Sequence, residues 1–478
     1  MKLLLLLLAA LLYKSECAVY ADKILNLPNL DFVPNFDQYA GYLQALPMKQ
    51  LYYWLTMSQN SSATDPLILY MNGGPGCSSL QALLTEMGPY RVSNYGKTVS
   101  LNPYSWNKFA NMLFIDGPAG VGYSFATDKN YTYSDDEVAD QNYQALKYFF
   151  NVKFPELKSV DFYIAGESYS GYYTPMLSTR LIDDKANFAN FKGMAIGNGC
   201  LDDKLLYNSI IQFSYNHAFI DETYYRNAVK KCCFKAGEDC DFYQYSLSND
   251  PSARCYNEST TLNLANFYTG LDPYFLYFSC YLDGKDPASR AVAYPHSHRL
   301  AHLRHLSKKL NLNVDLTGAV PPPCSHHDDD VLWLNKPEVR QAINVPTLVQ
   351  KYTGCSQDVG NNYITQYDTM SSFVIYALDA KIKTLFFNGD VDSVCNVNMN
   401  KQFLANLDRG LVQPATIWNM AVNLPPTAGF ITKYKDFDFA TIRGAGHFAA
   451  SAVEKPREAL QLIYNFVNNL DYSTPYPY

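Results

Sequence analysis

Short apolar runs recur along the chain, and most are followed by Gly, Asp or Asn. Six of them lie at 67–71, 112–115, 162–165, 194–196, 384–387 and 439–442. Runs that are apolar at every position are typical of strands buried on both faces of a parallel sheet. Helical patterns lie between them, including a segment from the capping-box pair Ser134 and Glu137 to Phe150, and apolar spacing over 459–470. The pattern predicts an α/β fold with a mostly parallel central sheet.

The middle of the chain has a different pattern. Strand and helix patterns are strong over 18–200 and 331–478, whereas 201–330 lacks strand-like runs and contains six cysteines. We therefore expect a core in two parts, 18–200 and 331–478, with a disulfide-rich cap at 201–330 inserted between them. Within the cap, a basic and histidine-rich segment at about 283–311 predicts an exposed, protease-accessible loop.

The first residues have the features of a secretory signal peptide in the right order. Lys2 precedes an apolar run over 3–12 that is too short to span a bilayer, and Ser15 and Cys17 supply small residues for a cleavage site. We expect 1–17 to be removed, so that the mature chain starts at Ala18. No later uncharged run reaches about 18 apolar residues, and no membrane span is expected.

Composition and charge exclude several classes of protein. With 48% apolar and 17% charged residues, the chain supports a large folded core and is neither disordered nor fibrous. A net charge of −7 argues against nucleic-acid binding. The histidines near 296–305 and 326–327 lack fixed ligand spacing, so we expect a solvated loop and no metal site.

Cysteines and sequons are consistent with an oxidising compartment. Ten cysteines remain after removal of the signal segment, and such a number predicts a disulfide framework. Their number does not reveal which cysteines pair. Sequons at Asn60, Asn130 and Asn257 are candidate glycosylation sites.

A strand, a sharp turn and a helical pattern meet at Ser168. The run at 162–165 leads into Gly166-Glu167-Ser168-Tyr169-Ser170, the context of a nucleophile elbow, although Ser170 occupies the second glycine position of G-x-S-x-G. Such a turn would expose the Ser168 hydroxyl at the end of the strand. From this motif alone, a structural turn serine is the alternative.

The expected base and acid follow in the order of an α/β-hydrolase, Ser, acid, His. Six of the eight histidines lie at 296–327, in and just after the basic loop, which leaves His217 and His447, and His447 lies in the loop after the last strand-like run. The acid is expected after the preceding run, where Asp390 and Asp392 compete. Asp392 is favoured because the later position projects towards the histidine, while Asp390 suits the turn. A plain Asx turn is the alternative for both.

The glycine-rich segment 72–76 follows the first buried run, as an oxyanion loop does in this fold. Hydrolysis of an ester or amide needs donors for the tetrahedral oxyanion, each worth about 3–4 kcal/mol of barrier. The backbone N–H groups of Gly74 and Tyr169 are the candidate donors, and a merely tight turn is the alternative.

Together these motifs resemble the serine carboxypeptidase family, particularly its cathepsin A-like lysosomal branch. The matching segments cover nearly all of the mature chain, at 72–79, 105–107, 118–124, 166–169, 389–392 and 444–447. The resemblance implies an α/β-hydrolase fold and release of C-terminal amino acids from peptides. It also implies a triad of Ser168, Asp392 and His447, and we expect no cofactor.

The resemblance further implies that Asn72, Glu86 and Glu167 bind the terminal carboxylate of the substrate. Two neighbouring carboxyls cannot easily both ionise, so one retains a proton and can donate a hydrogen bond to that carboxylate. Rising pH removes the proton, and we therefore expect binding to be best at acidic pH.

The resemblance also supplies disulfide pairings and a maturation step. The pairs are Cys77–Cys355, Cys232–Cys255, Cys233–Cys240 and Cys280–Cys324, which leaves Cys200 and Cys395 unpaired. The resemblance also implies a zymogen whose basic loop is cleaved. The two resulting chains would stay joined by the bonds Cys77–Cys355 and Cys280–Cys324. The resemblance favours a homodimer.

Several residues depart from the family pattern: Tyr70 for the usual Trp, Met87 for a polar residue, Ser170 for Ala or Gly, and Phe448-Ala449-Ala450 for Met-Val-Pro. They leave the triad intact but bear on side-chain preference.

An esterase or acyltransferase would use the same Ser, His and Asp without a carboxylate site, and a protective binding partner would need no triad. The signal peptide and the sequons do not distinguish a lysosomal protein from a secreted one.

Overall fold

The computed structural model describes residues 21–233, 240–246, 255, 258, 271–279, 329–420 and 426–477. The predicted signal peptide, the basic loop, Asn257, Cys280 and Cys324 lie outside these residues.

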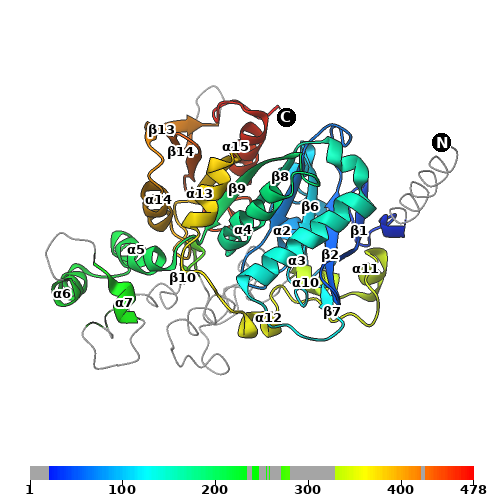
Figure 1. Ribbon diagram of the computed structural model, residues 1–478, viewed down its shortest axis with the longest axis horizontal. Coiled ribbons are helices and arrows are strands. Elements are labelled where there is room, and N and C mark those ends of the chain that lie inside the picture. Colours follow the sequence, from blue (N-terminus) through cyan, green and yellow to red (C-terminus); the bar gives the residue numbers. More distant parts are fainter. Residues whose placement is uncertain are drawn as a thin grey trace.

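A large twisted sheet forms the centre of the described molecule (Figure 1). Its strands are β1 (Gln38–Gln44), β2 (Lys49–Thr56), β3 (Leu67–Met71), β6 (Asn111–Ile115), β7 (Phe125–Ala126), β8 (Phe162–Ser168), β9 (Phe191–Gly199), β12 (Lys383–Gly389), β13 (Leu411–Asn419), β14 (Thr427–Tyr434) and β15 (Asp438–Ile442). Their order is β1-β2-β6-β3-β8-β9-β12-β15-β14-β13, with β7 beside β2. The strands from β6 to β15 in this order are parallel neighbours, and the outer strands pair antiparallel.

Two short hairpins accompany the sheet, β4 (Tyr90–Ser93) with β5 (Thr98–Leu101) and β10 (Leu271–Asp272) with β11 (Phe275–Ser279). The described helices are α2 (Leu80–Thr85), α3 (Asp135–Tyr148), α4 (Ser170–Asp183), α5 (Asp203–Asn216), α6 (Glu222–Cys232), α7 (Phe242–Ser246), α10 (Asp329–Leu334), α11 (Pro337–Ala342), α12 (Gln357–Asn362), α13 (Ser371–Asp379), α14 (Val397–Asn406) and α15 (Pro456–Asn468), with short turns at Trp106–Lys108, Phe149–Lys153 and Pro155–Ser159. None of these described helices is long and apolar enough to cross a membrane.

Alternate residues of the central strands pack into two hydrophobic cores, one on each face of the sheet. In β3, Leu67 and Leu69 belong to the core that contains residues of α3 and α4, and Ile68 and Tyr70 belong to the core that contains residues of α2 and α15. Burial on both faces explains why these strands are apolar at every position. The predicted α/β class is confirmed, and each of the six predicted runs lies in a strand.

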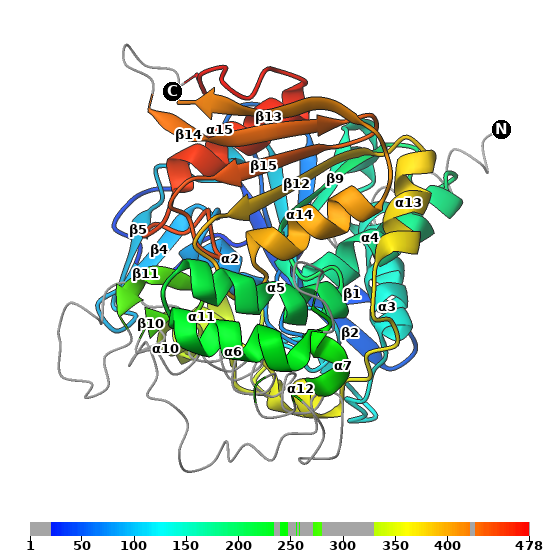
Figure 2. The same cartoon turned by 90° about the vertical axis from the view of Figure 1, so that its left-hand side faces the viewer.

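The outer strands and the cap hairpin were not among the predicted runs. The prediction that 201–330 lacks strands is wrong, because β10 and β11 pair there. This hairpin is short and shows no alternation of apolar and polar residues. The backbone N–H of Leu276 donates to the carbonyl of the distant Val391 at 3.3 Å. In the same range, α5, α6 and α7 lie together, beside β10 and β11 (Figure 2).

Among the described residues four disulfides are present, and one of them corrects an expectation. Cys77–Cys355, Cys232–Cys255 and Cys233–Cys240 have the expected pairing. Cys200 and Cys395, which we expected to be unpaired, also form a disulfide. Cys200 follows β9 and Cys395 follows β12, and the parallel pairing of these strands brings the two Cα atoms to 5.1 Å, within the range for a disulfide.

Strand β13 is the last strand of the sheet at one edge, and it is irregular. It contains Pro414, and its pairing with β14 shifts register at several points. Leu411, Val412 and Ile417 of this strand are exposed.

We expect the α3 capping box to contribute measurably to stability. Glu137 N–H donates to Ser134 Oγ, and Ser134 N–H donates to the Glu137 carboxylate at 2.8 Å. The change Ser134→Ala should lower the free energy of unfolding by about 1 kcal/mol, whereas Ser134→Thr, which keeps the cap oxygen, should lose less. Thermal unfolding monitored by circular dichroism would check this, and equal midpoints for both variants would contradict it.

Candidate active site

The C-terminal ends of the parallel strands meet at one edge of the sheet, as parallel pairing requires. Asn72 follows β3, Ser168 ends β8, and Asn198 lies at the end of β9. Asp392 follows β12, and His447 follows β15. Polar residues that are far apart in sequence are therefore collected at this edge.

Ser168 stands in a left-handed backbone conformation, with φ of +63°, at the turn between β8 and α4. A non-glycine residue with positive φ is strained, and such a turn is the geometry of a nucleophile elbow. At Gly166 a Cβ would lie 2.1 Å from Ser170 Oγ and 2.6 Å from the Met71 carbonyl oxygen, so only glycine fits. Ser170 is buried, with its hydroxyl 3.0 Å from that of Thr174. The turn thus forms with serine in place of the second glycine.

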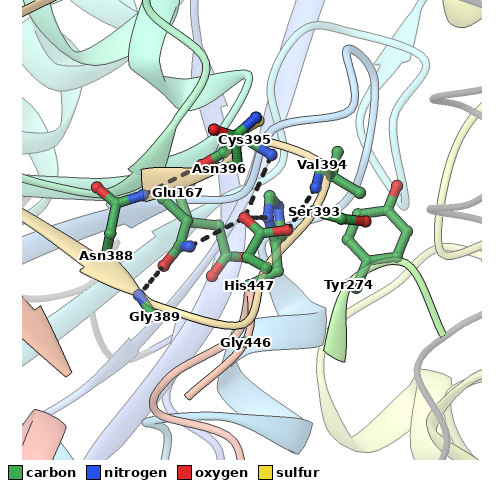
Figure 3. Close-up of polar contacts among 12 residues, drawn as sticks. Glu167, Tyr274, Asn388, Gly389, Ser393, Val394, Cys395, Asn396, Gly446 and His447 are labelled. Atoms are coloured by element: carbon green, nitrogen blue, oxygen red, sulfur yellow. Dashed lines mark hydrogen bonds and ion pairs between the residues drawn. The ribbon is translucent and has the colours of Figure 1, made fainter. Parts of the chain in front are cut away.

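His447 and Asp392 form a fully buried pair. Nδ1 of His447 lies 2.8 Å from Oδ2 of Asp392, and both side chains are 0% exposed. The Asp392 carboxylate also accepts the Nδ2–H of Asn198 at 2.9 Å and the backbone N–H groups of Val394 at 2.8 Å and Cys395 at 3.2 Å (Figure 3). These donors fix the orientation of the carboxylate, and with it the orientation of the imidazole.

The loop that carries His447 is held from two sides. Asp390 accepts the N–H of Gly444 at 2.6 Å, so the two competing aspartates have different partners. Burial raises the pKa of Asp390. Glu454 accepts the N–H of Gly446 at 2.5 Å and that of Phe448 at 3.1 Å, on either side of the histidine.

The cap hairpin contacts both loops. The backbone N–H of His447 donates to the carbonyl of Tyr274 at 2.8 Å, and the two rings meet edge to face with centroids 4.9 Å apart. The Ser393 hydroxyl donates to the Pro273 carbonyl at 2.7 Å. Residues 273–274 therefore lie against the loops of both Asp392 and His447.

Nε2 of His447 is buried and has no hydrogen-bond partner in the described part of the chain. Because Nδ1 faces Asp392, Nε2 is the ring nitrogen that can take up a proton. Hydrogen bonds between a nucleophile and its base are often loose in unliganded enzymes and tighten when substrate binds.

The glycine-rich loop after β3 packs against the Ser168 turn. A Cβ at Gly73 would lie 2.3 Å from the backbone nitrogen of Tyr169 and 2.8 Å from Ser168 Cβ. Gly74, with φ of +115°, follows at once. The backbone of Gly74 and that of Tyr169 thus lie on two contacting segments, at the N-terminus of α4, where partial positive charge favours an anion.

Two carboxyl groups are buried together beside this turn. Glu86 and Glu167 are 2% and 3% exposed. Asn72 Nδ2 donates to Glu167 Oε1 at 2.5 Å and to Glu86 Oε1 at 3.2 Å, and the Tyr70 hydroxyl donates to Glu167 Oε2 at 2.9 Å.

The electrostatics of this pair favour retention of a proton. Burial raises the pKa of Glu86. Burial, the neighbouring Glu86 charge and a hydrogen bond between the two carboxyls hold the pKa of Glu167 well above its usual range. Burial also raises the pKa of Tyr70 far above 10, so its hydroxyl remains a donor. One proton retained by the pair at acidic pH removes the repulsion between two ionised carboxylates.

The structure brings all the predicted triad, oxyanion and carboxylate residues to this edge and adds three others. Asn198 could have been noticed, since Gly197-Asn198-Gly199 directly follows a predicted strand. Tyr274 and Glu454 had no signal, because their roles depend on backbone contacts with distant loops. Elsewhere, Asn60 and Asn130 are exposed. No group of three or more His, Cys, Asp or Glu side chains in the described ranges is arranged to hold a metal ion.

Comparison with known proteins agrees with this arrangement. A family model described as serine carboxypeptidase matches residues 28–469. The chain belongs to the serine carboxypeptidase family. It is 40% identical to the serine carboxypeptidase ctsa-4.1 of Caenorhabditis elegans, over 99% of each chain, and 35% identical to the lysosomal protective protein of Mus musculus, over 98% of each. The family and the enzyme class predicted from the motifs, a serine-type carboxypeptidase, are confirmed.

Solved structures show the same fold for this carboxypeptidase family member. The crystal structure of Kex1Δp, a prohormone-processing carboxypeptidase from Saccharomyces cerevisiae, superposes with a TM-score of 0.67. The two sequences are 20% identical, and the alignment covers 95% of this chain and 96% of that one. The fold is the predicted α/β-hydrolase fold.

We expect Ser168 to react selectively with an organofluorophosphonate. The label should be found on Ser168 by peptide mass spectrometry and be absent from Ser168→Ala. His447→Gln should react about 10²–10⁴-fold more slowly, because the base is removed. Ser170→Ala is the matched control, since Ser170 is two residues away and its hydroxyl faces Thr174. Labelling at another serine, or equal rates with and without His447, would contradict the assignment.

Proposed function

We propose that this carboxypeptidase releases single amino acids from peptide C-termini through an acyl-enzyme on Ser168, with tightest binding at acidic pH. The observation that carries the proposal is the buried cluster of Asn72, Glu86 and Glu167 next to the Ser168 turn. Glu167 precedes Ser168 in the chain, and Asn72 precedes Gly73, which contacts Ser168. A carboxylate bound there lies one residue away from the scissile bond.

The reaction uses the remaining residues in a defined order. Ser168 Oγ attacks the carbonyl carbon of the last peptide bond while Nε2 of His447 takes the hydroxyl proton, and Asp392 stabilises the resulting imidazolium. The N–H groups of Gly74 and Tyr169 stabilise the oxyanion. Nε2 returns the proton to the departing amino group, the C–N bond breaks, and the free amino acid leaves. Water then hydrolyses the ester with His447 as the base, which restores Ser168.

The carboxyl pair explains why a chain end is selected. A protonated carboxyl donates a hydrogen bond to the substrate carboxylate, whereas two ionised carboxylates repel it. An esterase or acyltransferase with the same Ser, His and Asp has no use for this buried pair. The pair therefore favours the peptidase over these alternatives.

We also infer that the enzyme acts in the secretory pathway. Four disulfides and the exposed sequon residues Asn60 and Asn130 support an oxidising, glycosylating compartment. The name of the mouse relative favours the lysosome over secretion. Five points stay predictions. They are the removal of 1–17, an inserted cap between core parts at 18–200 and 331–478, cleavage of the basic loop, the pair Cys280–Cys324 and a homodimer. Reducing and non-reducing gels of mature material, together with light scattering, would test the last three.

Free amino acid should be released from an N-blocked hydrophobic dipeptide between about pH 4 and 7, the range in which paired carboxyls and histidine titrate. The C-terminally amidated dipeptide should react about 10–100-fold more slowly, because it loses charge-assisted hydrogen bonds worth about 1.5–3 kcal/mol. Ser168→Ala should abolish release, and Ser170→Ala should retain it. Equal rates for acid and amide would remove the carboxylate site from the proposal, even if the triad were active.

The Tyr70→Phe variant should bind peptides up to a higher pH. The Tyr70 hydroxyl donates to the ionised form of Glu167 and so lowers the pKa of the carboxyl pair. Without this hydrogen bond the carboxyl pair keeps its shared proton up to a higher pH. The pH at which KM begins to rise should therefore increase by about one unit. Tyr163→Phe is the matched control, because the Tyr163 hydroxyl contacts the distant Val467 carbonyl. A shift of KM to lower pH would contradict this role of Tyr70.

A further inference from the structure

The disulfide between Cys200 and Cys395 lies inside the candidate active site. Cys200 directly follows β9, and Cys395 lies between β12 and α14. The two residues are 8% and 0% exposed, their Cα atoms are 5.1 Å apart, and they are 195 positions apart in sequence. The bond therefore ties the two halves of the core together at the strand ends that carry the site.

Both cysteines donate backbone hydrogen bonds to residues of the proposed triad. The N–H of Cys200 donates to the carbonyl of Ser168 at 3.0 Å. The N–H of Cys395 donates to Oδ2 of Asp392 at 3.2 Å, and the same oxygen faces Nδ1 of His447 at 2.8 Å. The disulfide thus completes a continuous chain of covalent and hydrogen bonds from Ser168 through Asp392 to His447.

The surroundings give the two cysteines little freedom to move. A Cβ at Gly171 would lie 2.6 Å from the Cys200 carbonyl oxygen, so the first turn of α4 packs directly on Cys200. The carbonyl of Cys395 accepts the Nδ2–H of Asn388 at 3.1 Å and that of Asn400 at 3.4 Å. A shift of either cysteine would displace the N-terminus of α4 or the Asp392 loop.

We propose that the Cys200–Cys395 disulfide is a positioning element of catalysis, which holds the Asp392 loop against the Ser168 turn so that His447 meets the serine hydroxyl. The inference rests on the proposed roles of Ser168, Asp392 and His447. Residues 390–396 contain no helix or strand of their own, so their position depends on such ties. A displacement of about 1 Å in a catalytic group can lower the rate about 100-fold.

The first experiment tests the bond without any assay of activity. The full chain, expressed in a secretory host, is alkylated, digested without reduction and analysed by mass spectrometry. A linked peptide containing Cys200 and Cys395 is the expected result. Alkylated thiols at both positions in protein labelled at Ser168 would overturn the proposal.

The second experiment separates positioning from stability. Cys200→Ala, Cys395→Ala and the double variant should each lower kcat and the fluorophosphonate labelling rate about 10–100-fold, with KM for the blocked dipeptide within about twofold. The single and double variants should be alike, because each removes the same bond. The matched control, Cys232→Ala with Cys255→Ala, removes a disulfide that packs with Ile210, Ile211 and Ala228, away from the proposed triad. It should lower the thermal midpoint and leave kcat unchanged at 25 °C.

An unchanged kcat in the folded double variant would reduce the disulfide to a purely structural role.

If the variants are not secreted, the wild type is instead reduced under native conditions with a phosphine, which is oxidised as each disulfide becomes two thiols. Labelling of Ser168 should fall as thiols appear at Cys200 and Cys395 and return on reoxidation, and full labelling of molecules with both thiols free would overturn the proposal. Wild-type protein that labels but releases no amino acid would contradict the proposed function alone, since the labelling rate still reports on the disulfide.

Discussion

Parallel pairing of β3, β8, β9, β12 and β15 is the constraint on which the rest of the structure depends. The C-terminal end of each of these strands lies at the same edge, and burial of their side chains on both faces makes a shift of register costly. A slip of one residue in β3 would turn Tyr70 away from the core shared with α2 and α15. Its hydroxyl could then no longer reach Glu167 on the neighbouring strand, whose register is set by the pairing of Met71 with Gly166.

The edge that this pairing creates is dense in buried polar groups, and backbone N–H groups hold the acidic residues that orient the histidine. Asp392 accepts two N–H groups of its own loop, Glu454 accepts two from the histidine loop, and His447 donates its own N–H to the cap. Such bonds hold the carboxylates without relying on flexible side-chain donors, and they tie together loops that have no strand or helix of their own. The polar residues of the site are therefore pre-arranged before any peptide arrives.

The central sheet and most of the site could be predicted from sequence, for a physical reason. Strands buried on both faces have a clear apolar pattern, and the segment that follows such a strand lies at the shared edge, which placed Ser168, His447 and the pair Asp390 and Asp392. Asp392 was favoured within that pair because its later position projects towards the histidine. The edge strands β13 and β14 are partly exposed and pair irregularly, so their composition is mixed, whereas β2 is buried and apolar and was missed although its sequence carries a strand pattern. The partners of Cys200 and of Tyr274 depend on which strands are neighbours and on how the cap folds back, and neither is encoded in local spacing. The pairing of Cys200 was missed because the family resemblance, and not strand adjacency, was used to assign the cysteines.

The irregular end of the sheet at β13 has a consequence for how the enzyme behaves at high concentration. An exposed edge with Leu411, Val412 and Ile417 would ordinarily offer a template on which a second chain could add a strand. Pro414 lacks the N–H that such an addition requires, and the register shifts against β14 break up the row of available carbonyls. The sheet can therefore carry an apolar rim without offering a second chain a continuous strand to pair with.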